Sequence, residues 1–329
     1  MKYLITGGAG YIGSHMVNFL KKTNSEITIV DNLSTGHLYN TKDCEFIKLD
    51  LRDKDKLFNK LHKYKFDGVF HFAGKSIVSE SVIDPDIYYE NNIIGTNNLL
   101  ELIIKNDLNN LIFSSSAAVY GNTNEKLISE EHQKIPTNPY GESKLKAEKL
   151  INEFSNRYNL NTINLRYFNA CGADPSGDYG EDRINETHLI PNALISLIDK
   201  KNQFTIFGSN YPTKDGTCVR DYVHVNDIVK AHYLAMSKFN NQTFKDEFNI
   251  GLGLGFSVLE IIQACDAVTQ KKIELKYVDK RDGDPPILIA DNQKIKSILN
   301  WEPEYTNIKE IIKTAWNWHS KKHLQHSNR

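Results

Sequence analysis

The chain has 329 residues, 40% of them hydrophobic, and a formal net charge of -1, so it can form two lobes or one large α/β domain and gives no reason to expect nucleic acid or an anionic membrane as a partner. Its scattered cysteines include no Cys-x-x-Cys pair, which argues against a zinc site or a disulfide framework. No signal peptide or membrane-spanning run is apparent, so we expect a cytoplasmic protein.

Short apolar runs alternate with longer amphipathic stretches in the first half. We predict strands at 2–6, 26–30, 45–50, 68–73, 110–116 and 161–168, and helices near 12–22, 53–63, 86–105 and 139–158. Strands that are apolar almost throughout, separated by helices, indicate a parallel sheet covered on both faces. The predicted fold class is therefore α/β, a Rossmann-type doubly wound sheet with a smaller C-terminal α/β lobe.

The pattern changes after Phe168, where loops rich in Gly, Pro, Asp and Asn surround a helix expected near 189–200. Further strands are predicted at 220–225 and 247–251, helices at 257–268 and 308–320, and a frayed tail from Lys321. We expect a dinucleotide-binding domain at 1–170 with a returning segment near 219–251. Residues 171–218 and 252–329 would form a second, substrate-binding lobe.

The first glycine cluster follows the first strand and opens the first helix. Gly7, Gly10 and Gly13 would allow a tight turn, close approach of a pyrophosphate, and helix–strand packing. Asp31 ends the second strand, where a carboxylate can bind the ribose hydroxyls of an adenosine. Because Asp31 would repel a 2'-phosphate and no Arg stands beside it in DNLSTG, NAD is favoured over NADP.

The stretch NPYGESK places Tyr140 and Lys144 one helical turn apart, after a good N-cap (Asn138) and a Pro suited to the first helical position. The spacing alone carries little weight, because Tyr305 and Lys309 repeat it. A Tyr hydroxyl with a pKa of about 10 needs roughly 3 units of help to act as a base near pH 7. The Lys144 cation and an oxidised nicotinamide can provide that help.

Together, the glycine motif, the Ser114–Ser116 run and the Tyr-Lys pair resemble the extended short-chain dehydrogenase/reductase superfamily. Within it the chain most resembles the UDP-glucose 4-epimerase family, from Lys2 to about Trp318. The resemblance rests on the segments TGGAGYIGSH, VDNLSTG, HFAGKSIVSESV, YYENNIIGTNNLL, FSSSAAVYG, PYGESKLKAE, LRYFNACGADPSG, TIFGSNYPTKDGTCVRDYVHV and RDGDPP.

The resemblance implies interconversion of UDP-glucose and UDP-galactose by transient oxidation at sugar C4 with tightly bound NAD. Tyr140, Lys144 and Ser116 would be catalytic, with Tyr140 as base and acid. The implied NAD site comprises Gly7, Gly10, Tyr11, Ile12, Gly13, Asp31, Asn32, Asp50, Leu51, Phe72, Ala73, Asn92, Ser114, Tyr140, Lys144 and Phe168. The implied substrate site comprises Ser116, Tyr140, Asn169, His188, Leu189, Phe207, Arg220, Arg281 and Asp284, with the two arginines suited to a diphosphate. No metal is expected, and the family implies a homodimer formed through the Tyr-Lys helix and the helix before it.

Several alternatives stay open beside this interpretation. NDP-sugar 4,6-dehydratases carry an Asp-Glu pair where this chain has Ala117 and Ala118, which cannot transfer protons. Leu288 stands where residue bulk guards the sugar 2-substituent, so epimerisation of UDP-N-acetylglucosamine is a second hypothesis. An NAD-binding regulator would typically lack the intact Tyr-Lys pair, and a net oxidoreductase would need added NAD.

The segment FAGKS departs from the family pattern after the fourth predicted strand. Some family members have a Lys one position after Lys75, where this chain has Ser76. Neither Lys75 nor Ser76 is therefore assigned the NAD contact that this Lys makes in the family.

Overall fold

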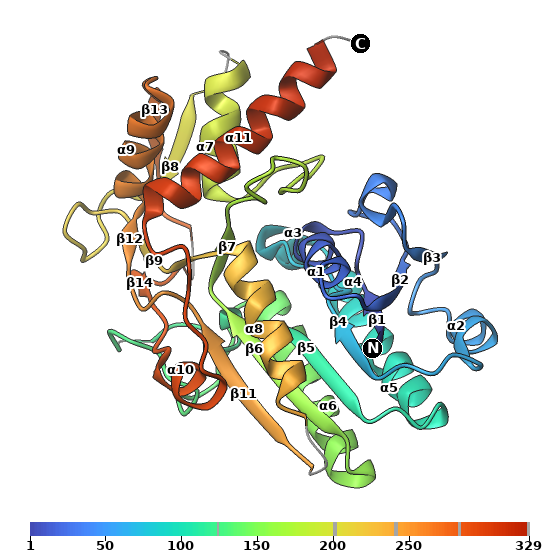
Figure 1. Cartoon of the computed structure of the whole chain (residues 1–329). Helices are drawn as coiled ribbons and strands as arrows, with labels where there is room; N and C mark the ends of the chain where they lie inside the picture. The colour runs from blue at the N-terminus through green and yellow to red at the C-terminus, as the bar shows by residue number, and fades with distance from the viewer. Residues whose placement is uncertain (124, 200–202, 240–242, 282–283, 328–329) are drawn as a thin grey trace.

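A seven-stranded parallel sheet forms the body of the molecule (Figure 1). The computed structural model describes residues 1–123, 125–199, 203–239, 243–281 and 284–327. Its strand order is β11-β6-β5-β4-β1-β2-β3. The strands are β1 (Lys2–Thr6), β2 (Glu26–Asp31), β3 (Glu45–Lys48), β4 (Gly68–His71), β5 (Asn110–Ser116), β6 (Asn161–Tyr167) and β11 (Lys245–Ile250). The predicted doubly wound fold is confirmed.

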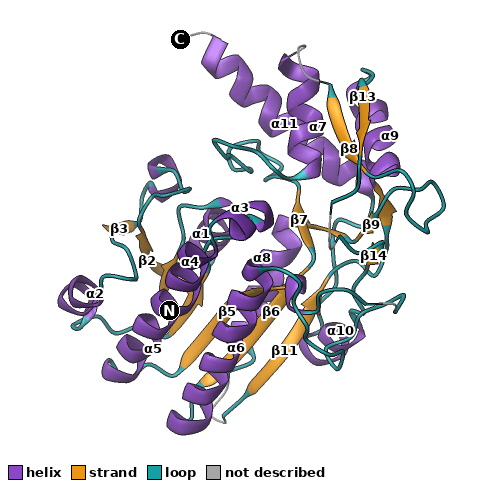
Figure 2. Ribbon diagram, turned by 180° about the vertical axis from the view of Figure 1, so that it is seen from behind, coloured by secondary structure: helices purple, strands orange, loops and turns teal. Residues whose placement is uncertain are grey.

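Helices cover both faces of this sheet (Figures 1 and 2). One face carries α1 (Tyr11–Lys21) and α8 (Val225–Ser237), whose buried residues share a core with β1, β2 and β6. The other carries α2 (Lys54–Leu61), α5 (Gly95–Lys105) and α6 (Pro139–Tyr158) over a second, Leu-rich core. Burying one such Leu side chain contributes about 1.5–3 kcal/mol, so the two cores fix the helices firmly on the sheet.

The smaller lobe has its own core between three helices and a strand pair. The helices are α7 (Leu189–Asp199), α9 (Val258–Thr269) and α11 (Ile308–Ser327), and the parallel strands are β8 (Phe204–Phe207) and β13 (Leu275–Val278). Short strands join the lobe to the sheet: β7 (Asn169–Cys171) pairs with β10 (Tyr222–His224), and β9 (Val219–Arg220) lies between β12 (Phe256–Ser257) and β14 (Ile287–Leu288). The short helix α10 (Gln293–Leu299) packs near β11 and α8.

Several predicted boundaries differ from the structure. The strands predicted to reach Asp50 and Ala73 end at Lys48 and His71, because the chain leaves the sheet there to line the site. The single strand predicted at 220–225 is split into β9 and β10, which pair with different partners. The helix predicted near 189–200 was expected to end at residue 200, which lies outside the described residues.

Several helical segments also differ from prediction, and α10 was not predicted. The helix expected at 86–105 consists of α4 (Pro85–Tyr89), a π-helical turn (Glu90–Ile94) and α5, preceded by the short α3 (Val78–Ile83). Helix α8 was not predicted, although its apolar residues recur at helical spacing. The expected fraying from Lys321 is wrong as far as Ser327, because α11 continues and Lys321 pairs with Asp178 (2.6 Å).

Candidate active site

A cavity of about 610 Å³ lies at the carboxyl ends of the parallel strands, below the smaller lobe. Crevices at this edge are where open α/β sheets bind ligands. The cavity collects residues from the turn after β1, from the ends of β2, β4 and β5, from the start of α6 and from the loop 171–188. All the predicted cofactor and substrate residues line it except Asn92 and Phe207.

The glycine turn opens this cavity at the start of α1. Gly7 has a φ of +73°, and a Cβ there would stand 2.5 Å from the Ala73 backbone nitrogen. A Cβ on Gly13 would stand 2.1 Å from the Gly7 carbonyl oxygen. At Gly10 a Cβ would meet only that same oxygen, at 3.4 Å, so this position faces open space. The turn therefore leaves room for a phosphate beside the first turn of α1, which has no side-chain cap.

Carboxylates gather at the ends of β2 and β3. Asp31 accepts hydrogen bonds from the backbone nitrogens of Ala9 (3.0 Å) and Leu33 (2.7 Å), which fixes it against the glycine turn. Asp50 accepts a bond from the Asn32 side chain (3.0 Å). A hydrogen-bonded ion pair with Arg52 lowers the pKa of Asp50 to about 2. Polar acceptors at this end of the cavity suit the hydroxyls of an adenosine ribose.

Arg52 is a cavity-lining residue that the sequence reasoning did not single out. It lies two residues after Asp50 and well beyond the DNLSTG segment in the chain, so only folding brings the Asp50–Arg52 pair beside Asn32. Its guanidinium contacts Asp50 (2.9 Å) and Glu90 (3.1 Å). Since two carboxylates already neutralise it, Arg52 offers little net charge for a 2'-phosphate, and the preference for NAD over NADP is kept.

Tyr140, Lys144 and Ser116 all line the cavity. The Asn138 side chain accepts a bond from the Gly141 nitrogen (2.9 Å) and Pro139 begins α6, so the predicted helix start is confirmed. Tyr140 is hydrogen-bonded to Ser116 at the end of β5. One helical turn after Tyr140, the Lys144 ammonium donates a hydrogen bond to the Ser114 carbonyl oxygen (2.9 Å). This bond fixes the position of the Lys144 side chain.

Burial sets the protonation of this pair. It raises the pKa of Tyr140, although the Ser116 hydrogen bond and the charge of Arg183 act in the opposite direction. Burial also lowers the pKa of Lys144 to about 8, against the attraction of Glu148. Glu148 itself is held by Arg166 through two bonds, at 2.8 and 2.7 Å. The phenol thus needs positive charge from its surroundings or from a bound cofactor to ionise near neutral pH.

Asn92 lies behind the cavity wall, in the π-helical turn. Its side chain accepts from the Lys75 nitrogen (2.8 Å) and donates to the Lys75 carbonyl oxygen (3.1 Å) and the Ser143 hydroxyl (2.8 Å). Ser143 in turn donates to the Tyr140 carbonyl oxygen (2.7 Å). Asn92 therefore ties the loop after β4 to the first turn of α6.

Two arginines line the cavity far from the glycine turn in the chain, Arg220 at the end of β9 and Arg281 after β13. Arg220 pairs with Asp284 (2.6 Å), and Arg281 stacks over the Phe207 ring at 3.9 Å from its centroid. Phe207 thus lies beneath Arg281 and does not line the cavity itself. Asp282 and Gly283 of the RDGDPP segment lie outside the described residues. Two guanidinium groups at one end suit a diphosphate.

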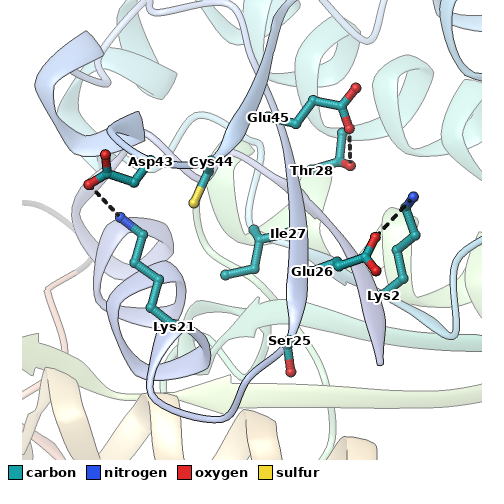
Figure 3. A pocket seen from close by; sticks show the side chains of 9 residues that line it. All are labelled: Lys2, Lys21, Ser25, Glu26, Ile27, Thr28, Asp43, Cys44 and Glu45. Carbon is teal, nitrogen blue, oxygen red and sulfur yellow. Dashed lines mark hydrogen bonds and ion pairs between the residues drawn. The ribbon is translucent and has the colours of Figure 1, made fainter.

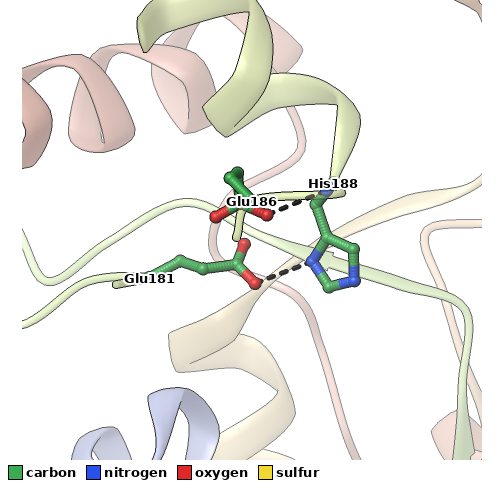
Figure 4. A group of neighbouring side chains, drawn as sticks. All are labelled: Glu181, Glu186 and His188. Atoms are coloured by element: carbon green, nitrogen blue, oxygen red, sulfur yellow. Dashed lines mark hydrogen bonds and ion pairs between the residues drawn. The ribbon is translucent and has the colours of Figure 1, made fainter. Parts of the chain in front are cut away.

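An ion-pair cluster borders the cavity in the loop 171–188 (Figure 4). Glu181 contacts His188 (2.7 Å) and Arg183 (2.8 Å), and Glu186 accepts from the His188 backbone nitrogen (2.8 Å). Although burial opposes it, the charges of His188 and Arg183 lower the pKa of Glu181 to about 2, whereas burial and Glu181 raise the pKa of Glu186 to about 7. Glu181, Glu186 and His188 have donor atoms within 4.8 Å of one another, as a metal site would, but the Arg183 guanidinium occupies one carboxylate oxygen and would repel a cation.

Other candidate features lie away from this site. A hollow of about 270 Å³, lined by Lys2, Lys21, Glu26, Asp43 and neighbouring residues, opens beside the amino end of β2 and not at the carboxyl edge (Figure 3). Tyr305, the other Tyr of a Tyr-x-x-x-Lys spacing, stacks on His224 at 3.7 Å, outside the cavity. The four cysteines are free, and no helix within the described residues is apolar and long enough to span a bilayer.

Comparisons with known proteins agree with this site. The family profile described as GDP-mannose 4,6 dehydratase matches residues 4–315. The UDP-glucose 4-epimerase of Halalkalibacterium halodurans is 45% identical over 97% of this chain and 96% of its own. The structure of UDP-glucose 4-epimerase from Brucella ovis in complex with NAD is 39% identical, with a TM-score of 0.92 over 96% of this chain and 97% of that one.

A second solved structure is the UDP-Glc/GlcNAc 4-epimerase of Campylobacter jejuni, 38% identical, with a TM-score of 0.85 over 97% of this chain and 99% of that one. The similarity in sequence and in fold thus extends over nearly the whole chain. On this evidence the chain belongs to the UDP-glucose 4-epimerase family, within the extended short-chain dehydrogenase/reductases.

Proposed function

We propose that this chain is an NAD-dependent UDP-glucose 4-epimerase that interconverts UDP-glucose and UDP-galactose. The observation that carries the proposal is one cavity with an open glycine turn at one end, two arginines at the other, and Tyr140 with Ser116 and Lys144 between them. The glycine turn and the polar end of β2 fit NAD, since Gly10 leaves free space where a pyrophosphate would lie. Bound there, NAD would supply reversible hydride transfer at sugar C4.

The chain's own residues would then handle the proton and the orientation of the sugar. Tyr140 would take the proton of the 4-hydroxyl and later return it, with Ser116 hydrogen-bonded to the same oxygen. Lys144 would favour the phenolate by its charge. Arg220 and Arg281 would hold the diphosphate while the sugar turns, so that hydride returns to the opposite face of C4.

The two ligands would be bound by different parts of the chain. Residues 1–170, with the returning segment near 219–251, would bind NAD, and residues 171–218 and 252–329 would bind the UDP-sugar. The glycine turn in the first set and Arg281 in the second support this division, whereas Arg220 would bind the diphosphate from within the returning segment. On the same basis we propose the cofactor and substrate roles given in the sequence analysis. Asn92 and Phe207 do not line the cavity and would act by holding residues that do, Lys75 and Arg281.

Turnover without an added oxidant is the decisive measurement. Purified protein should convert UDP-galactose to UDP-glucose with no NAD in the assay, as followed by chromatography of the two sugars. The nucleotide released on denaturation should have the mass and absorbance of NAD. A requirement for stoichiometric NAD would indicate a net dehydrogenase instead, and loss of water from the product would indicate a 4,6-dehydratase.

The dehydratase and regulator alternatives have less support. Ala117 and Ala118 both line the cavity, so neither position offers an acid for elimination of water. The intact Tyr140, Lys144 and Ser116 constellation is not needed by a protein that only senses NAD.

A second candidate activity is epimerisation of UDP-N-acetylglucosamine. Leu288 lines the cavity and packs against the cluster that contains Phe168 and Leu145. Leu is smaller than the Tyr of some family members, so the cavity has more room for a sugar substituent at this position. Turnover of UDP-glucose and of UDP-N-acetylglucosamine, measured under the same conditions, would test this, with Leu288→Tyr as the matched variant. Selective loss of the acetylated substrate in that variant would support the second activity, and no turnover of it by wild type would end the hypothesis.

Assembly and location are also proposals. We propose a homodimer in the cytoplasm, formed through α5 and α6, which pack side by side on one face of the sheet. Light scattering after gel filtration should give twice the chain mass of 37.6 kDa. A monomer at micromolar concentration would contradict the dimer.

A further inference from the structure

A buried ion pair lies between the catalytic helix and the sheet, and no step of the proposed mechanism uses it. Arg166 of β6 is 1% exposed and Glu148 of α6 is 2% exposed. The guanidinium donates to both carboxylate oxygens, from Nε at 2.8 Å and from Nη2 at 2.7 Å. A bidentate pair of this kind holds its two partners in one defined geometry. Neither residue lines the cavity, so neither is placed to touch a ligand bound there.

Further contacts hold the guanidinium from the other side. Its Nη1 donates to the Tyr120 hydroxyl (3.0 Å), and its Nη2 lies 3.3 Å from the carboxylate of Glu247 in β11. The Tyr120 hydroxyl in turn donates to the Asn249 side chain (2.7 Å). Because Arg166 is fixed by all of these groups, it provides a rigid anchor on the sheet for the helix residue Glu148.

Ser115 connects this ion pair to the end of β5. Its hydroxyl donates to the Glu148 carboxylate at 2.6 Å, and the residue is 1% exposed. Ser115 is also the register partner of Arg166 in the parallel pairing of β5 with β6. Paired residues of neighbouring strands point to the same face of a sheet, here the face that α6 covers. Two strands and one helix therefore converge on a single carboxylate.

The end of β5 depends on this contact because it has a neighbouring strand on one side only. β4 pairs with β5 from Leu111 to Phe113, whereas β6 pairs with β5 as far as Ser116. Ser114 and Ser116, which lie beyond the last pair with β4, both line the cavity. The position of this stretch is therefore set by β6 and by the side chains that hold it against α6.

Helix α6 meets the same stretch through three side chains spaced one turn apart. Tyr140 is hydrogen-bonded to Ser116. Lys144 donates to the Ser114 carbonyl oxygen (2.9 Å). Glu148, one turn further, makes the buried contact described above. Because residues four apart lie on one face of a helix, a shift of this strand end would misplace both catalytic contacts together.

From this geometry we infer that Ser115 is a positioning residue of the reaction. Its bond to Glu148 fixes the end of β5 against α6, so that Ser116 and Tyr140 keep the distance that proton transfer requires. The inference rests on the proposed function, because it takes Tyr140 as the group that accepts the proton. A misplacement of about 1 Å costs a reaction about 100-fold in rate. Since Ser115 lies outside the cavity, its loss should affect the chemical step and not the affinity for the sugar nucleotide.

The test compares Ser115→Ala with Ser155→Ala in the purified protein. Ser155 is a matched control at the far end of α6, because its hydroxyl is also buried and donates at 2.7 Å, to the Leu160 carbonyl oxygen. Each variant loses one buried hydrogen bond, so we expect similar small decreases in the urea midpoint of unfolding. Only Ser115→Ala should lower kcat per bound NAD, by about 10- to 100-fold, with KM within about twofold of wild type.

Two further readouts separate positioning from stability. UDP-galactose with deuterium at C4 should give an isotope effect on kcat at least as large in Ser115→Ala as in wild type, because the step that is slowed is hydride and proton transfer. Adding Ser116→Ala should lower kcat by clearly less than the product of the two single losses. The two changes are not independent, because the first acts through the placement of the second residue.

Any of four results would overturn the inference. In Ser115→Ala these are a kcat per bound NAD within about twofold of wild type, or an isotope effect smaller than that of wild type. The others are an equal loss of kcat in Ser155→Ala and single losses that multiply fully in the double variant. Failure of the wild type to epimerise any UDP-sugar is a separate outcome, which would overturn the proposed function and this inference with it.

Discussion

Tyr140 shows how one side chain depends on its surroundings. Only 8% of it is exposed, and burial raises its pKa, which opposes the role of a base. Near pH 7 the cost of forming a phenolate is about 1.4 kcal/mol for each unit by which its pKa lies above the pH. Nearby positive charge and the Ser116 hydrogen bond act against that cost. The residue is therefore reactive only in an assembled site.

Replacing Tyr140 by Phe should abolish turnover while keeping the fold. We expect kcat to fall by about 10²–10⁴-fold, because proton transfer to a positioned group contributes about that much. Bound NAD content and melting temperature should change little. Tyr305→Phe is the matched control, since it removes the same hydroxyl from the other Tyr-x-x-x-Lys spacing and keeps the stacking on His224. Similar losses in both variants would contradict a catalytic role for Tyr140.

At the scale of elements, the junction between β1 and α1 has two kinds of glycine. Gly13 is required by the protein itself, since a Cβ there would stand 2.1 Å from the Gly7 carbonyl oxygen. Gly10 is not crowded by protein, as its nearest contact would be an ordinary 3.4 Å. Its lack of a side chain matters only to whatever lies in the cavity. The same motif thus contains a packing position and a ligand position.

Alanine at these two positions should separate the roles. Gly13→Ala should lower the free energy of unfolding by about 1–3 kcal/mol or more, because the backbone must move apart to admit the methyl group. Gly10→Ala should unfold at the wild-type urea concentration once nucleotide is removed, yet retain much less NAD on purification. Urea titration and nucleotide content per chain check both. Equal destabilisation by the two variants would contradict this assignment.

At the scale of the whole molecule, Asp182 connects three distant segments around the cavity. Its carboxylate accepts a hydrogen bond from Tyr39 (2.7 Å) in the loop after β2 and pairs with Lys322 of α11. His37 of the same loop contacts the Asp182 carbonyl oxygen (2.9 Å). Because the loop after β2 also borders the predicted adenosine end, these contacts close the smaller lobe over that end of the cavity.

Loss of the Asp182 carboxylate should speed the release of NAD. Hydrogen bonds to a charged group contribute about 1.5–3 kcal/mol each, so Asp182→Ala should increase the dissociation rate by about tenfold or more. Asp178→Ala is the control, as Asp178 pairs with Lys321 of the same helix but is exposed and lies outside the cavity. Release can be followed by transfer of NAD to an excess of a trapping dehydrogenase. Identical rates in the two variants would show that the Asp182 contacts do not retain the nucleotide.

Local patterns predicted the central elements well because they are encoded over short distances. The strand 110–116 and the helix 139–158 have the predicted boundaries, since Asn138 and Pro139 mark a helix start by local hydrogen bonding. Helix α8 and the split of the strand at 220–225 were missed. Both depend on partners far away in the chain, such as Met16 of α1 for α8 and Asn169 for β10. The π-helical turn that holds Asn92 is likewise stabilised by tertiary contacts with Lys75 and Ser143.

The sequence by itself determined the fold class, the glycine turn, the Tyr140/Lys144 pair and the family resemblance, because each is carried by residues close together in the chain. Only the tertiary structure decided which charged groups lie together in the cavity wall. Arg52 beside Glu90, Arg220 beside Asp284 and Lys144 against the Ser114 carbonyl are contacts in which folding sets both distance and burial. Coulomb interactions depend on distance and on exclusion of water, and neither can be read from residue order.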